Sequence, residues 1–183
     1  MKKKITTIIT MLLCAILTIT AISTDTAYAA DKNIPVKVTF KKKTITLNVN
    51  TEKGGIDRVK LSTLKKKWGK PGSNKDEFMA EYAWKKGESE IKYVDVYEQP
   101  HSSQIYITAY DKNTSIYGIK VGMTKTKVKK LLKKLGKVEA QQNGDGSLDM
   151  LFVHILDDGS AYINCYFEND KVSGIQAGLY FYE

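Results

Sequence analysis

Cysteine and proline are scarce in this chain of 183 residues, which contains two cysteines and three prolines. Cys14 lies in an N-terminal segment that we expect to be removed, so Cys165 would be the single cysteine of the mature protein. One cysteine cannot form an internal disulfide, which excludes a fold held together by disulfides. Cys165 lies on an apolar strand face, where we expect a buried thiol; the alternative is pairing with a second molecule.

Histidine is equally scarce, and the residue spacings typical of catalytic and metal sites are missing. His101 lies in a predicted loop and His154 in a predicted strand. There is no His-x-x-x-His or Cys-x-x-Cys spacing, no nucleophile elbow and no glycine-rich phosphate loop. The carboxylate pair Asp157-Asp158 falls in a predicted turn, which such residues favour. The sequence therefore predicts a protein that is not an enzyme and has neither a metal site nor a cofactor.

Arginine is almost absent, although the chain is basic. It contains 29 Lys and Arg against 20 Asp and Glu, and Arg58 is the only arginine. Nucleic-acid and phosphate sites rely on the forked guanidinium, so we expect no nucleic-acid partner. Outside the cell, a basic protein meets anionic wall polymers, anionic lipids and acidic proteins.

The first 29 residues have the three parts of a bacterial signal peptide. Residues 1–4 are basic, residues 5–22 are apolar, and Ala27-Tyr28-Ala29 supplies small residues for cleavage after Ala29. Cleavage leaves 26 basic and 19 acidic residues, a net charge of +7. We expect a secreted or envelope-associated protein. The alternatives are a retained membrane anchor and a lipoprotein signal, for which Cys14 lies too deep in the apolar stretch.

Residues 30–54 are expected to form a leader with a β-hairpin, because residues 36–40 and 45–49 alternate apolar and polar. The rest of the chain contains one unit twice. Residues 55–70 align without a gap on residues 122–137, and both stretches begin with glycine and end with Gly-Lys.

Each copy predicts an amphipathic helix followed by alternating strands. The first helix would begin at Asp57 as its cap, and the second would run from Thr124 to Gly136. Strands are expected at 78–84, 91–97, 105–110 and 116–121 after the first helix, and at 149–156, 161–167 and 172–182 after the second. This order predicts an α+β fold of two tandem helix-plus-antiparallel-sheet repeats, residues 55–121 and 122–183, with both helices on one side.

The predicted strands separate aliphatic from aromatic side chains, because successive residues of a strand point to opposite faces. The two helices would cover the aliphatic face, and nothing remains to cover the other. A rigid, amphipathic tyrosine surface suits recognition of a protein; the alternative is that tyrosines form stabilising cross-strand pairs. The candidate partner-binding residues are Tyr106, Tyr110, Tyr162 and Tyr166, together with Tyr82, Trp84, Tyr93 and Tyr97.

Lysines fill the polar side of the second predicted helix. A charge run of this kind is typical of a solvated helix face, and the alternative is a face that binds a polyanion. The candidate polyanion-binding residues are Lys129, Lys130, Lys133 and Lys134.

The segment Ile119-Lys120-Val121-Gly122-Met123-Thr124, with the apolar helix stripe and Gly136-Lys137 after it, resembles the start of the helix–sheet unit of β-lactamase-inhibitor-protein-like domains. It is also similar to small lipoproteins of the outer-membrane barrel assembly machinery. The resemblance covers residues 55–183. It implies two repeats that build one curved sheet, with helices on the convex side and a concave aromatic face that grips a partner protein. The disulfides of the inhibitor have no counterpart here.

Two functional hypotheses follow. The first is an exported, non-catalytic binding module that grips a partner protein through its aromatic sheet face, with an enzyme inhibitor as a special case. The second is a cell-envelope protein that binds an anionic wall polymer or anionic lipid through its lysine-rich helices.

Overall fold

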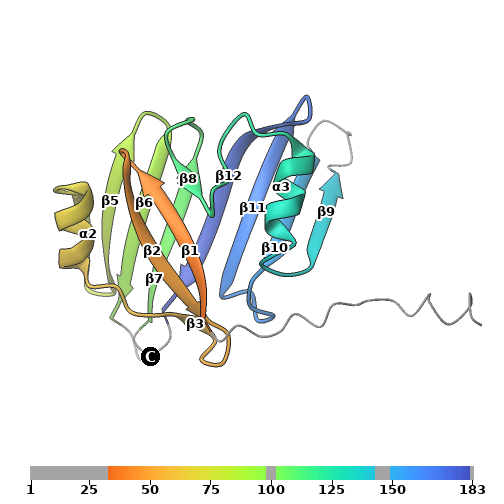
Figure 1. The fold of residues 1–183 in the computed structure, drawn as a ribbon. Helices are drawn as coiled ribbons and strands as arrows, with labels where there is room; N and C mark the ends of the chain where they lie inside the picture. Colours follow the sequence, from red (N-terminus) through yellow and green to blue (C-terminus); the bar gives the residue numbers. More distant parts are fainter. Residues whose placement is uncertain (1–32, 98–101, 143–148, 182–183) are drawn as a thin grey trace, which may run out of the picture.

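The computed structural model describes residues 33–97, 102–142 and 149–181, which form two antiparallel sheets and two short helices (Figure 1). The predicted signal peptide and His101 lie outside the described residues. Within these ranges no helix has the length and apolar character that a membrane span requires.

The larger sheet has eight strands in the order β4-β5-β6-β7-β12-β11-β10-β9. Neighbouring strands are antiparallel throughout, and the centre of the sheet is the pairing of β7 with β12, where Ile107 lies opposite Ala177. The strands are β4 (Gly72–Lys75), β5 (Met79–Lys86), β6 (Ser89–Val96), β7 (Ser102–Ala109), β9 (Val138–Gln142), β10 (Asp149–His154), β11 (Ala161–Glu168) and β12 (Lys171–Tyr180).

The smaller sheet has four strands in the order β3-β2-β1-β8. Its strands are β1 (Asn33–Phe40), β2 (Lys43–Asn50), β3 (Gly55–Ile56) and β8 (Ser115–Ile116). The predicted hairpin is confirmed as β1 and β2. Its period-two pattern buries Val36, Val38 and Phe40 on one strand and Leu47 and Val49 on the other.

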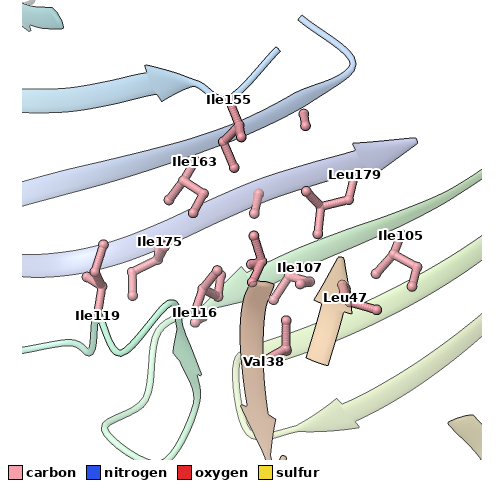
Figure 2. Close-up of a cluster of buried hydrophobic side chains, with 14 of the residues drawn as sticks. Val38, Leu47, Ile105, Ile107, Ile116, Ile119, Ile155, Ile163, Ile175 and Leu179 are labelled. Carbon is pink, nitrogen blue, oxygen red and sulfur yellow. The ribbon is translucent and has the colours of Figure 1, made fainter. Parts of the chain in front are cut away.

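The small sheet and the helices α2 (Leu61–Trp68) and α3 (Lys125–Leu132) all lie on the same face of the large sheet (Figure 1). We call these elements, formed by residues 33–70 and 111–137, the covering layer. The core fills the space between the two layers. Figure 2 shows Val38 and Leu47 of the hairpin pointing toward Ile107, Ile175 and other aliphatic side chains of the large sheet.

A series of aromatic ring contacts links β1, α2 and β5 across this core. The Phe40 ring of β1 meets the Trp68 ring of α2 edge-on at 6.0 Å between centroids, and Trp68 meets Trp84 of β5 at 5.6 Å. The indole N–H of Trp84 donates a hydrogen bond of 2.8 Å to the Gly69 carbonyl, at the end of α2. These contacts fix hairpin, helix and sheet relative to one another.

The predicted fold class is wrong. The described chain is mostly antiparallel sheet, arranged as two sheets of eight and four strands, and it is not two helix-plus-sheet repeats. Each of the two helices has only eight residues. The sequence patterns overestimated the lengths of both helices. The segments next to the helices contain residues that favour a helix, but in the structure these segments form strand pairs and turns.

The start of the first helix shows the reason. Asp57 was expected to cap it, but α2 begins at Leu61. Ile56 is fully buried as part of β3, opposite Val49, and the Asp57 amide donates to the Asn48 carbonyl. Strand pairing therefore holds the backbone extended through this position. The second helix does begin after Thr124, as predicted, although the Thr124 side chain forms no capping hydrogen bond.

Two edge strands, β4 and β9, were not predicted. All four residues of β4 are exposed, and β9 is exposed at four of its five positions. Because neither strand buries an alternating apolar face, the period-two signal is absent from their sequences.

We expect Phe40→Ala to lower the free energy of unfolding by about 3–5 kcal/mol, because the substitution removes a fully buried ring and leaves a cavity between layers. Lys37→Ala, an exposed position of the same strand, should change it by less than about 0.5 kcal/mol. Urea unfolding of the two variants and the wild type measures both values. Equal midpoints for Phe40→Ala and Lys37→Ala would contradict this view of the core.

Candidate functional site

The face of the large sheet opposite the covering layer carries a cluster of tyrosines, which we call the open face. On β12, Ile175, Ala177 and Leu179 point into the core, so the alternate residues point to the open face. The register places the same face on the neighbouring strands. Its central residues are Tyr106 and Thr108 of β7, Tyr110 just after β7, Gly174, Gln176, Gly178 and Tyr180 of β12, Tyr162, Asn164 and Tyr166 of β11, and Phe152 of β10.

Two glycines of β12 hold the tyrosine rings flat against the sheet. A Cβ atom built on Gly178 would lie 2.5 Å from Cε1 of Tyr162, and one on Gly174 would lie 2.6 Å from Cε1 of Tyr110. Real Cβ atoms do not approach rings this closely, so each ring occupies space that only glycine leaves open. The rings are therefore positioned by the backbone of the neighbouring strand.

Hydrogen bonds fix the tyrosine hydroxyls as well. The Tyr106 hydroxyl donates to Oε1 of Gln104 at 2.8 Å and lies 3.1 Å from the Tyr180 hydroxyl. Tyr166 donates to Oε1 of Gln176 at 2.7 Å. Partial burial raises the pKa of Tyr106, Tyr162 and Tyr166 above the ordinary value for tyrosine. These phenols thus stay neutral at physiological pH.

Four of the eight predicted partner-binding residues lie on the open face, namely Tyr106, Tyr110, Tyr162 and Tyr166. Their side chains are half-buried except for Tyr110, which is 43% exposed. The structure brings these four together around β12, as strand alternation predicted.

The expectation that Tyr82, Trp84 and Tyr93 share this face is wrong. Trp84 and Tyr93 are 1% and 4% exposed and belong to the core, and the Tyr82 ring lies 5.0 Å from Nζ of Lys65 on α2. On β5 and β6 the charged residues, such as Glu81 and Lys92, take the open face instead. Aromatic content does not identify the face of a strand, because large rings fill a core equally well.

Tyr97 also lies away from the four open-face tyrosines. It follows the end of β6, and its amide donates to the Phe78 carbonyl at 2.7 Å. Lys75, whose Nζ lies 5.6 Å from the Tyr82 ring centroid, also interacts electrostatically with Tyr97. Tyr97 is 38% exposed and provides a matched control for the open face.

Sequence reasoning missed Tyr180 and the two glycines. Gly174, Gln176, Gly178 and Tyr180 alternate with Ile175, Ala177 and Leu179. The sequence contains this period-two pattern. The tyrosines that lie against the glycines could not be predicted, because only the strand pairing of the structure shows which strands are the neighbours of β12.

The predicted polyanion-binding residues Lys129, Lys130, Lys133 and Lys134 are all exposed on or just after α3. Lys134 also lines a cleft of about 900 Å³ beside the end of the helix. Three carboxylates, Glu139, Asp157 and Asp158, line the same cleft. The cleft therefore offers charges of both signs.

In the part of the chain that the structure describes, no group of three or more His, Cys, Asp or Glu side chains could hold a metal ion. Asp158 serves the turn, because its Oδ1 accepts hydrogen bonds from the Ser160 amide at 2.8 Å and the Ser160 hydroxyl at 2.6 Å. The hydrogen bond from the Ser160 hydroxyl lowers the pKa of Asp158 most, and the hydrogen bond from the Ser160 amide lowers it further.

Comparison with family models, curated proteins and solved structures finds no match. The resemblance to β-lactamase-inhibitor-protein-like domains is therefore not shown by any of them.

We expect Gly178→Ala to lower the free energy of unfolding by about 1–3 kcal/mol, because the new methyl group must displace the Tyr162 ring. In a Tyr162→Ala background the same change should cost much less, which a double-mutant cycle measures. Gly72→Ala is the control, since its Cβ would lie 3.9 Å from the nearest atom. Equal costs of Gly178→Ala in both backgrounds would show that the ring does not occupy this space.

The thiol of Cys165 should be inert in the folded protein. Its side chain is fully buried, and burial raises its pKa to about 12, so that only about one thiol in ten thousand is ionised at pH 8. We expect a thiol reagent such as DTNB to react with it only after unfolding in guanidinium chloride. Rapid reaction of the native protein, or a disulfide-linked dimer under non-reducing conditions, would contradict this prediction.

Proposed function

We propose that this protein is an exported, non-catalytic binding module that grips a partner protein through its open face. The observation that carries the proposal is the fixed arrangement of Tyr106, Tyr110, Tyr162 and Tyr166 around the two glycines of β12. Export rests on the signal peptide predicted from residues 1–29.

Fixed rings favour binding because association must overcome the loss of side-chain freedom. Ordering a mobile side chain at an interface costs about 0.5–1.5 kcal/mol. Tyr110 and Tyr162 already lie against Gly174 and Gly178, and the Tyr106 and Tyr166 hydroxyls are already hydrogen-bonded. Most of this cost is therefore met during folding, before a partner arrives.

The polar residues between the rings indicate the chemistry of the partner. Thr108, Asn164 and Gln176 lie among the tyrosines and are half-buried. Such a surface, aromatic but rich in hydrogen-bonding groups, suits a folded protein surface of mixed polarity. It suits a lipid bilayer poorly, because the apolar part of a bilayer offers no partner for the hydrogen-bonding capacity that these side chains have left beyond their contacts with the tyrosines.

Site-specific photo-crosslinking tests the proposal. A photoreactive amino acid at Asn164, at the centre of the open face, should crosslink one partner protein in the producing cells. The same amino acid at Lys37, exposed on the covering layer, should not crosslink it. With the identified partner purified, Tyr106→Ala and Tyr166→Ala should each weaken binding about 30-fold, the effect of a hot-spot residue.

The control is Tyr97→Ala, which removes an exposed tyrosine away from the open face and should change the affinity less than about twofold. Thermal unfolding of each variant separates loss of binding from loss of folding. Folded Tyr106→Ala and Tyr166→Ala variants that bind as tightly as the wild type would refute the proposal, as would equal crosslinking from Asn164 and Lys37.

A further inference from the structure

Charge is segregated between the two layers of the molecule. The covering layer consists of residues 33–70, with ten lysines and Arg58 against Glu52 and Asp57, and residues 111–137, with nine lysines against Asp111. Their net charges are +9 and +8. The segments that form the large sheet, residues 71–110 and 138–183, carry −3 and −7. The modest net charge of the whole chain therefore conceals one strongly cationic layer.

The lysines of this layer are exposed except for Lys125, which is half-buried and pairs with Asp149 of β10 at 2.6 Å. Every lysine from Lys37 to Lys70 is exposed, whereas the apolar side chains of the hairpin and α2 face the large sheet. So many like charges on one surface repel one another, which lowers folding stability and attracts anions. The covering segments contain few carboxylates of their own, although Asp149 and Glu139 of the large sheet pair with Lys125 and Lys137. The layer as a whole keeps a strong positive charge, which attracts an external polyanion.

A groove of about 510 Å³ lies within this layer, between α2 and β2. Thr44 and Thr46 of β2 line one side, and Thr63 and Lys67 of α2 line the other. Arg58 and Lys60, from the segment before the helix, line it as well. The groove thus combines three cations with three hydroxyl groups, and no carboxylate is among the described residues that line it.

We propose that the covering layer binds a phosphate-bearing anionic polymer, with the groove between α2 and β2 as its principal site. A guanidinium fork, ammonium groups and hydroxyl donors match the several acceptor oxygens of a phosphate group. The only arginine of the chain lies in this groove. The neighbouring end of the hairpin, residues 41–43, adds three exposed lysines for further phosphates along the polymer.

The groove differs in its charges from the surface beside α3, where the sequence suggested polyanion binding. The cleft next to Lys134 also contains Glu139, Asp157 and Asp158, which repel an anion. The groove beside α2 has cations without such carboxylates, so it should bind more tightly although it contains fewer lysines than α3.

A polymer fits this layer better than a membrane surface. The large apolar side chains that are exposed among the described residues are Phe78, Met79, Tyr97 and Tyr110. All four belong to the segments of the large sheet, so the covering layer presents no large exposed apolar side chain, within the described residues, for insertion between lipids. A groove also suits a chain that can enter it, whereas a bilayer contacts only protruding side chains.

Binding of long-chain polyphosphate and of poly(glycerol phosphate), measured at 50, 100 and 200 mM salt, tests the proposal. The wild type should bind both, with affinity that falls steeply with salt. The variant Arg58→Gln/Lys60→Gln/Lys67→Gln should bind at least tenfold more weakly at 100 mM salt. The slope of log affinity against log salt should fall by about 2, because three phosphate contacts are removed.

The matched control is Lys129→Gln/Lys130→Gln/Lys134→Gln, which removes the same charge from α3 and the residues just after it. This variant should weaken binding less than threefold. Equal losses in the two triple variants would overturn the groove as the principal site. Equally tight binding of polygalacturonate would overturn the preference for phosphate. Binding to phosphatidylglycerol vesicles without binding to either polymer would overturn the choice of a polymer.

The polymer site and the protein-binding face can be tested separately, because they lie on opposite sides of the large sheet. Tyr106→Ala/Tyr166→Ala changes the opposite face of the large sheet and should leave polymer affinity unchanged. A loss of polymer binding in that variant, with the fold intact by urea unfolding, would contradict a site in the covering layer.

Discussion

The contact between the covering layer and the large sheet is the interaction on which the rest of the structure depends. A β-hairpin and two eight-residue helices each have one apolar face, and none of them would be stable alone. Stacked on the sheet, they bury Phe40, Trp68, Trp84 and the aliphatic side chains of the central strands. The free energy of the fold comes mainly from the water excluded between these two layers.

That contact also determines what each outer surface presents. Because the apolar side of each covering helix and of the hairpin faces the sheet, most of their lysines face solvent, and the layer becomes cationic. Because all the covering elements lie on one face, the other face of the sheet keeps its tyrosines, held flat by Gly174 and Gly178. The two proposed binding surfaces are thus the two outer sides of a single packing arrangement. A molecule of this kind would join an anionic polymer on one side to a protein on the other.

Sequence periodicity located the hairpin, the strands around the core and the start of the second helix, because each of these buries one face in register with its own alternation. It failed for β4 and β9, which are exposed edges, and for residues 57–60, which follow the strand pairing of Ile56 and precede the helix. At the site it identified Tyr106, Tyr110, Tyr162 and Tyr166 correctly as open-face residues. It misplaced Trp84 and Tyr93, because a ring that suits a binding surface also suits a core.

The sequence by itself determined the cationic balance, the single thiol of the predicted mature chain, and the alternation that divides β7, β11 and β12 into two faces. These properties depend only on composition and on the geometry of an extended chain. Only the tertiary structure decided that the hairpin joins the helices, that Arg58 lies in a groove with Lys60 and Lys67, and that two glycines hold the tyrosines in place. Each of these arises from contact between segments far apart in the chain, which local patterns do not record.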